Sequence, residues 1–190
     1  MNSASLRFVP AKDLAKEGYG EYAALFAPAK GKSEAKAPAP KTETAYLAGG
    51  CFWGVQHLLR KAPGIVSTEV GYTKGKTGEK EAAESVKIVF DPSRTSYAKI
   101  LEYFYKLHDP THKNRQGNDL GAQYRSAIFV LNADQRKLAE AAKKTASEKW
   151  KAPATTEIVD FASYEKASED HQDYLAKHPH GYTCHYVREL

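Results

Sequence analysis

The two cysteines are the residues of this chain with the clearest chemical potential. Cys51 stands in A-G-G-C-F-W-G, between paired glycines and two large aromatics, and Cys184 stands in H-G-Y-T-C-H-Y near the end of the chain. The thiolate is the nucleophilic form of cysteine, and the free amides and dipole at a helix N-terminus favour it. Because a predicted strand ends at Gly49-Gly50 and a helix begins near Phe52, the sequence predicts a reactive Cys51 thiol with a lowered pKa.

Two interpretations of the stretch around Cys51 stay open at this point. A free cysteine among apolar residues is commonly a small buried hydrophobe, and Phe52 and Trp53 could both belong to the core. However, two consecutive aromatics on a helix cannot face the same stripe, so one of them should point away from the core. An aromatic wall beside a sulfur nucleophile suits a small apolar group such as a methyl, and sulfur–ring contacts contribute about 0.3–1.5 kcal/mol.

The spacing of the cysteines and histidines argues against a disulfide framework and against a metal site. The cysteines are far apart and neither belongs to a C-x-x-C pair, so neither a zinc knuckle nor a local dithiol is available. His108 and His112 flank a D-P-T break, and no H-E-x-x-H pattern occurs. We expect no metal, and if the two thiols cooperate, the fold must bring them together.

The composition is that of a globular protein with a basic balance. Hydrophobic residues make up 42% and charged residues 27% of the 190, and the net charge of +5 is scattered without an RNP-like or zinc-finger pattern, so nucleic-acid binding is not predicted. No apolar run approaches the roughly 20 residues of a membrane span. The start of the chain lacks the regions of a secretory signal, which predicts a cytoplasmic protein and leaves a trimmed secreted form open.

The composition of the chain changes at about residue 43. Residues 1–43 end in a Pro/Ala/Lys segment that cannot bury apolar surface, which predicts an extension or linker, partly disordered, with a short helix in D-L-A-K-E-G-Y-G-E-Y-A-A-L-F. Residues 44–190 should form one domain with a mobile C-terminal tail.

Short strands and helices alternate within the predicted domain. The expected strands, the second pairing with the third, are 44–48, 64–73, 85–90, 126–131 and 155–161. The expected helices, the second and third capped by Ser96 and Asn132, are 52–61, 96–107, 132–150 and 168–177. This order predicts an α+β fold: a two-layer sandwich with a central mixed, mainly antiparallel sheet flanked by helices, with a ferredoxin-like core.

Six stretches of the domain together resemble one enzyme family. They are G-C-F-W-G, V-G-Y-T, A-E-S-V-K-I-V-F-D-P, L-H-D-P-T, N-R-Q-G-N-D-L-G-A-Q-Y-R-S-A-I-F and H-Q-D-Y-L-A-K-H-P-H-G-Y. In this order, over roughly residues 45–186, they resemble the type A peptide methionine sulfoxide reductases. The resemblance implies thiol-dependent reduction of methionine S-sulfoxide, free or in oxidised proteins and peptides. It also implies no cofactor beyond an external thiol, either a thioredoxin-like protein or dithiothreitol.

The resemblance assigns the first chemical step to residues near the start of the domain. Cys51 would attack the sulfoxide sulfur while Phe52 and Trp53 cradle the substrate methyl. Counting back from the D-P of the third stretch places the family's glutamate at Glu84, whose carboxyl, kept protonated in a partly apolar site, would protonate the departing oxygen. The count crosses a shortened loop, so Glu81 and Glu79 remain alternatives.

The resemblance assigns the remaining roles to the second half of the chain. Asp119 and Tyr124 would orient the substrate backbone and hydrogen-bond the sulfoxide oxygen, and they stand in a polar, glycine-containing loop of the kind that carries functional groups. Attack leaves a sulfenic acid on Cys51, which a second thiol converts to a disulfide. The resemblance implies Cys184 for that role and a disulfide reducible by thioredoxin. An unpaired surface cysteine is the alternative for Cys184.

One segment departs from the family pattern. Between V-G-Y-T and Glu84 the chain has only K-G-K-T-G-E-K-E-A, without the family's P-T-Y, and Ala82 stands where the family has His. Losing an oxygen donor can cost about 2.7–4 kcal/mol, so weakened activity is expected. The alternatives are a weakly active or inactive methionine-sulfoxide-binding module and another cysteine enzyme, although no Cys-His-Asn/Asp order is recognisable.

Overall fold

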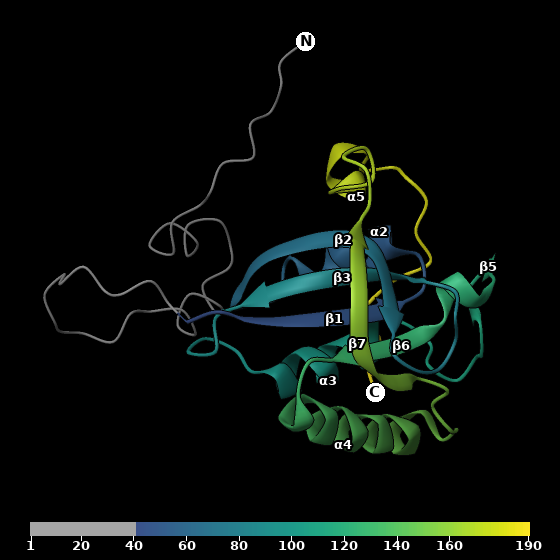
Figure 1. Ribbon diagram of the computed structural model, residues 1–190. Helices are drawn as coiled ribbons and strands as arrows, with labels where there is room; N and C mark the ends of the chain where they lie inside the picture. The colour runs from purple at the N-terminus through teal and green to yellow at the C-terminus, as the bar shows by residue number, and fades with distance from the viewer. Residues whose placement is uncertain (1–40) are drawn as a thin grey trace, which may run out of the picture. The chain divides into compact units, whose positions relative to one another are not determined.

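The computed structural model describes residues 41–190, which form a barrel of strands with helices packed outside it (Figure 1). The domain predicted from residue 44 begins with a strand at Glu43. The linker and the short helix predicted before it lie outside the described residues.

Five strands make up the barrel. They are β1 (Glu43–Gly49), β2 (Ile65–Gly75), β3 (Ala83–Phe90), β6 (Ser126–Val130) and β7 (Glu157–Lys166), in the closed order β1-β3-β2-β7-β6. Every neighbouring pair is antiparallel except β6 and β7, which are parallel. The predicted α+β class with a mixed, mainly antiparallel sheet is therefore confirmed.

Strand β7 closes the sheet into a barrel, where the sequence predicted an open two-layer sandwich. Its first half pairs with β6 and its second half pairs with β2, so one strand joins the two ends of the sheet. The prediction ended this strand at residue 161, five residues before its end at Lys166. The missed half is mostly exposed and polar, and it lacks the apolar alternation by which a strand is recognised.

The helices lie outside the barrel, joined to it by short segments. They are α2 (Phe52–Leu59), α3 (Tyr97–Leu107), α4 (Ala133–Trp150) and α5 (Tyr174–Lys177), and the loop between α3 and β6 carries the short strands β4 (Arg115–Gln116) and β5 (Asp119–Leu120) and the 3-10 turn η3 (Ala122–Tyr124). Both predicted caps are confirmed: the Ser96 hydroxyl accepts from the Lys99 amide at 3.3 Å, and Asn132 accepts from the Gln135 amide at 2.9 Å.

The last helix is much shorter than predicted. It was expected from residue 168, but α5 begins at Tyr174 because Asp173, at its N-cap, has φ +53°, in the left-handed region that a right-handed helix cannot pass through. The Gln172 side-chain amide accepts from the Val70 N–H at 2.9 Å and donates to the Val70 and Ala167 carbonyls at 2.8 and 2.9 Å. These bonds tie the segment before α5 to β2.

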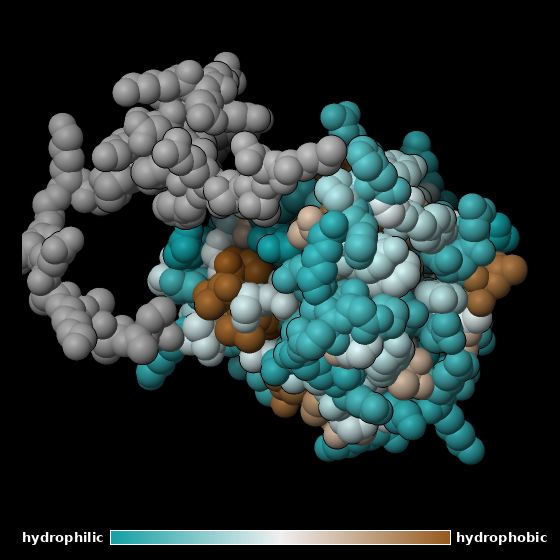
Figure 2. Space-filling view, turned by 90° about the horizontal axis from the view of Figure 1, so that it is seen from above, coloured by the Kyte–Doolittle hydropathy of each residue, from teal (hydrophilic) through white to brown (hydrophobic). Residues whose placement is uncertain are grey.

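The core lies between the sheet and the helices packed on it. The predicted stripe of α3 is buried there with side chains from β1, β3 and β6, among them Leu47, Ile88, Ile100, Leu101, Phe104, Leu107 and Ile128. The surface drawn in Figure 2 is mainly hydrophilic and is broken by small separate hydrophobic patches. No helix between residues 41 and 190 is long and apolar enough to cross a membrane.

Candidate active site

Cys51 lies at the tight turn between the end of β1 and the start of α2. Gly50 has φ +102°, a conformation that favours glycine, and Cys51 occupies the N-cap position of α2. The predicted strand, glycine pair and helix around Cys51 are thus confirmed. The thiol is nevertheless buried, with 7% of the residue exposed.

The predicted low pKa of Cys51 is wrong for the resting protein. Burial raises the pKa of this thiol to about 12, and the nearby Glu84, Asp119 and Cys184 raise it further, against the opposing hydrogen bond from the Trp53 backbone. Desolvation disfavours the charged form more than one helix-terminal amide favours it. At neutral pH the resting Cys51 thiol is therefore protonated.

Glu84 places its carboxyl beside Cys51. It lies near the start of β3, opposite Tyr72 of β2, and its Oε2 accepts from the Phe52 amide at 3.1 Å. Burial raises the pKa of Glu84 to about 7 against that hydrogen bond, and Asp119 raises it further. A substantial fraction of this carboxyl is therefore protonated at neutral pH.

The two alternative glutamates lie in the segment before β3. Glu81 is exposed, and Glu79 accepts from the backbone amides of Lys80 and Glu81 in its own turn. Glu84, by contrast, is bonded to the first residue of α2, so the geometry favours it as the carboxyl next to Cys51.

The two aromatics after Cys51 differ in burial, and both rings lie against His171, with ring centres 5.5 and 5.6 Å away. Phe52 is 2% exposed and lies 5.6 Å, ring centre to ring centre, from Tyr72. Trp53 is only partly buried: its indole donates to His171 Nδ1 at 3.2 Å and stacks on Tyr174, with ring centres 3.9 Å apart and planes at 15°.

The H-Q-D-Y stretch holds Trp53, a role that the sequence reasoning missed. Beyond the contacts of His171 and Tyr174 with the indole, Asp173 accepts from the Arg60 guanidinium at 2.9 Å and its amide donates to Gln56 of α2 at 2.9 Å. These bonds fasten the start of α5 to α2. The run of four polar and aromatic residues, His171 to Tyr174, is the sequence signal for this role.

Asp119 and Cys184 meet on the other side of Cys51. The Asp119 carboxylate accepts from the Tyr182 hydroxyl at 3.3 Å and from the Cys184 thiol at 3.4 Å. Burial and the Asp119 charge raise the pKa of Cys184 to about 11. Both cysteines are free thiols. Gly50, the residue before Cys51, packs against the Gln116 side chain, and the Cys184 thiol donates to the Gln116 carbonyl at 3.7 Å, so both cysteines lie next to Gln116.

Tyr124 ends the η3 turn at the same site. Its pKa is raised by burial and by the nearby Glu84, Asp119 and Cys51. The next residue, Arg125, fixes the turn, because its guanidinium donates to the Ala122 carbonyl at 2.8 Å and to Glu157 of β7 at 3.1 Å. The structure therefore brings together all seven residues singled out from the sequence: Cys51, Phe52, Trp53, Glu84, Asp119, Tyr124 and Cys184.

The shortened segment between β2 and β3 runs along β7. Gly75 pairs with Phe161, and the Lys76 amide donates to the Asp160 carbonyl at 2.8 Å. Residues 76–82 contain no tyrosine. Within residues 41–190, Tyr72 and Tyr124 lie close enough to Glu84 for its charge to raise their pKa values.

The histidine that had been weighed as a metal ligand has a structural role. His108 is fully buried, with Nδ1 bonded to the Phe104 carbonyl at 2.9 Å and Nε2 bonded to the Ser126 hydroxyl at 2.8 Å. Burial lowers its pKa to about 3, so the ring is neutral. Residues 41–190 contain no group of three or more His, Cys, Asp or Glu that could hold a metal ion.

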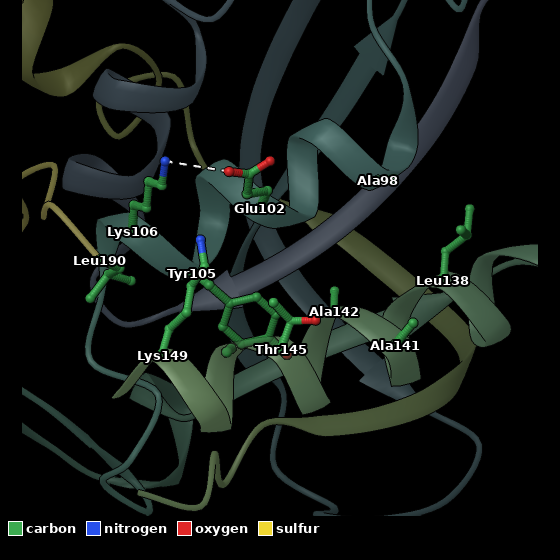
Figure 3. A pocket seen from close by; sticks show the side chains of 11 residues that line it. Ala98, Glu102, Tyr105, Lys106, Leu138, Ala141, Ala142, Thr145, Lys149 and Leu190 are labelled. Atoms are coloured by element: carbon green, nitrogen blue, oxygen red, sulfur yellow. Dashed lines mark ion pairs between the residues drawn. The ribbon is translucent and has the colours of Figure 1, made fainter. Parts of the chain in front are cut away.

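An apolar groove between α3 and α4 is separate from this site (Figure 3). It encloses about 390 Å³ and is lined by residues including Tyr105, Leu138, Ala142 and the C-terminal Leu190, and by none of the seven predicted site residues. The end of the chain is held next to it, because the Arg188 amide donates to the Lys106 carbonyl at 2.9 Å. The C-terminal Leu190 lies in this groove, which contains none of the predicted catalytic residues.

Known proteins of one family match this chain. A family model described as peptide methionine sulfoxide reductase matches residues 43–190. The chain is 50% identical to peptide methionine sulfoxide reductase MsrA of Nocardia farcinica, across 77% of this chain and 91% of that protein. Reduced Mxr1 from Saccharomyces cerevisiae superposes with a TM-score of 0.73 at 32% identity, covering 83% and 98% of the two chains. Mxr1 in complex with Trx2 gives 0.60 at 27% identity, covering 83% and 97%.

Proposed function

Because this chain belongs to the peptide methionine sulfoxide reductase family, type A, we propose that it reduces methionine (S)-S-oxide, free or in proteins, through Cys51 and Glu84. The observation that carries this assignment is the Glu84 carboxyl, with a pKa near 7, bonded to the amide that directly follows Cys51. A proton donor therefore lies beside the sulfur nucleophile, as oxygen transfer from a sulfoxide requires.

In the first step the Cys51 sulfur bonds to the sulfoxide sulfur and the Glu84 proton goes to the sulfoxide oxygen. The resulting hydroxyl then passes to the Cys51 sulfur while the new S–S bond and the methionine S–O bond break, so methionine leaves as the reduced thioether and Cys51 becomes a sulfenic acid. Glu84 regains a proton from the Cys51 thiol, so one proton moves from sulfur to oxygen overall. This exchange explains how a thiol with a pKa near 12 reacts at neutral pH: it loses its proton only as the oxygen gains one.

The substrate is held by the surrounding aromatic and polar side chains. Trp53, fixed by Tyr174 and His171, forms a wall for the methyl together with Phe52. Tyr124 donates to the sulfoxide oxygen, and Asp119 orients the substrate backbone.

In the second step Cys184 attacks the Cys51 sulfenic acid, a disulfide forms and water leaves. A thioredoxin-like protein reduces that disulfide and returns both thiols. The Mxr1 complex with Trx2, similar to this chain in fold and sequence, supports such a partner.

Three finer assignments accompany this function. Strands β6-β1-β3-β2 with α2 and α3 correspond to a ferredoxin-like core that β7 closes into a barrel. The enzyme uses no prosthetic group, and its reducing equivalents come from thioredoxin or dithiothreitol. It works in the cytoplasm, through a domain of residues 44–190.

A turnover assay with dithiothreitol and the two epimers of a methionine sulfoxide peptide tests this function. Consumption of the S epimer alone, absent in Cys51→Ser, is the expected result. The 76–82 segment, which brings no tyrosine to the site, favours one other function, a methionine-sulfoxide-binding module. Tight binding of the S epimer without turnover would establish that module and overturn the reductase.

A further inference from the structure

We propose that His185 is the catalytic base that takes the proton of Cys184 when this thiol attacks the Cys51 sulfenic acid. The proposal rests on the proposed function and adds a residue to its second step. His185 directly follows Cys184, and its Nδ1 lies 3.5 Å from the Cys184 sulfur.

The backbone of Gly49 fixes the tautomer of the His185 ring. His185 Nε2 lies 2.7 Å from the Gly49 carbonyl oxygen, which can only accept, so Nε2 carries the hydrogen. Burial is the main effect on the pKa of His185 and lowers it, so the ring is neutral at pH 7. A neutral imidazole protonated on Nε2 has its lone pair on Nδ1, the atom that faces the Cys184 thiol.

The two glycines that flank Cys51 make the space for this ring. His185 is 7% exposed, and a Cβ at Gly54 would collide with its Nδ1. A Cβ at Gly50 would lie 3.1 Å from Nε2. The His185 amide also donates to the Thr183 hydroxyl at 3.1 Å, which sets the turn of the tail. The imidazole is therefore seated against the backbone on both sides of the reacting cysteine.

Cys184 needs a base because its pKa is near 11, so only a small fraction is thiolate at neutral pH. The Asp119 carboxylate at 3.4 Å and the Gln116 carbonyl at 3.7 Å also face this thiol. A carboxylate repels the thiolate that forms beside it, whereas a neutral imidazole that takes the proton becomes a cation and attracts that thiolate. Asp119 instead stabilises the imidazolium that forms.

The charged and titratable groups around His185 are consistent with transient protonation. Asp119 and the Gly49 carbonyl raise the pKa of His185, whereas Arg188 lowers it, and the neutral His108 and the Cys184 thiol complete its surroundings. In the step itself, the Cys184 proton moves to Nδ1, the Cys184–Cys51 bond forms and the S–O bond of Cys51 breaks. The departing hydroxide takes the proton from Nδ1 and leaves as water.

His185→Gln tests the proposal, because glutamine can keep the bond to Gly49 but offers only a weakly basic oxygen to Cys184. One equivalent of methionine sulfoxide peptide is mixed with reduced enzyme, and methionine release and disulfide formation are followed by rapid quench. We expect unchanged methionine release and disulfide formation slowed roughly 100-fold or more at pH 7. The slow rate should rise about tenfold per pH unit toward the pKa of Cys184, whereas that of the parent enzyme stays level above neutral pH.

The matched control is His112→Gln, at a ring that is 62% exposed and lies in the α3–β4 loop. Parent-like disulfide formation in His185→Gln would overturn the proposal, as would equal slowing of methionine release, which marks a structural role. Slowing in Asp119→Asn but not in His185→Gln would assign the base to Asp119. If the parent releases no methionine, the proposed function fails, and sulfenic acid made with hydrogen peroxide tests His185 separately.

Discussion

The surroundings of the two cysteines differ in how they are built. Cys51 is held by regular elements, between the end of β1 and the start of α2, with Glu84 of β3 bonded to the next residue. Cys184 lies in a tail without helix or strand, where individual bonds from Asp119, Gln116 and His185 surround it. The first environment suits a reaction that needs fixed geometry. The second suits a thiol that must change partners.

Replacing each cysteine by serine is the strongest test of that division. Cys51→Ser should abolish methionine release, because no sulfur remains to take the oxygen. Cys184→Ser should still release one methionine per enzyme and then stop under thioredoxin, because the sulfenic acid is not resolved. Single-turnover and steady-state assays on the same samples measure both. Sustained thioredoxin-driven cycling of Cys184→Ser would remove Cys184 from the cycle.

Glu84→Gln should lower the rate of methionine release about 10²- to 10⁴-fold, because glutamine keeps the bond to the Phe52 amide but has no proton to give. In the parent, the Glu84 carboxyl loses its proton as pH rises through its pKa of about 7, so the rate of methionine release should fall above pH 7. A pH–rate profile of single-turnover release checks both points. Glu81→Gln, at an exposed carboxyl of the preceding segment, is the control and should keep the falling limb.

Tyr174→Ala should weaken substrate binding and leave the chemical step nearly unchanged. It removes the ring stacked on Trp53, and an aromatic pair is worth about 0.5–1.5 kcal/mol, so KM should rise roughly 2- to 10-fold. Tyr186→Phe, at a tail residue that is 61% exposed, is the control. A large loss of kcat at unchanged KM would mean that Trp53 acts in the reaction itself.

The last test concerns stability rather than rate. The Glu84 pKa is raised in the folded state from about 4.5 to about 7, so the stability that its buried neutral form provides is complete below pH 4.5 and is lost as pH rises through 7. Glutamine does not titrate. Glu84→Gln should therefore gain about 1–3 kcal/mol relative to the parent between pH 4 and pH 8, measured by urea unfolding. If the difference in unfolding free energy between Glu84→Gln and the parent stays constant from pH 4 to pH 8, the pKa of Glu84 is not raised in the folded protein.

The roles of Glu84, Asp119, Tyr124 and Cys184 could be predicted only through the resemblance to the family. Much of the fold could be predicted because the relevant signals are local. The caps Ser96 and Asn132, the apolar stripe of α3 and the glycine turn before Cys51 depend on neighbours in sequence. Long-range contacts produced the errors. The barrel closes through the polar half of β7, and the segment expected to begin the last helix is instead bonded to β2 through Gln172, with the chain turning at Asp173 before α5.

The prediction of a low pKa for the Cys51 thiol was wrong for the same reason. The helix terminus at Cys51 is a local feature and was recognised, but the burial and the carboxylates that raise the thiol pKa come from β3, β5 and the tail. Likewise, His171, Tyr174 and His185 act through partners that are 118, 121 and 136 residues away in sequence, at Trp53 and Gly49. No spacing rule reaches that far.

The closed order of the five strands limits how other protein chains can pair with this sheet. A sheet edge offers unpaired backbone groups to any extended chain, whereas each barrel strand here is hydrogen-bonded on both sides over part of its length. An extended segment of an oxidised substrate protein therefore finds few open strand edges here on which to add as a further strand.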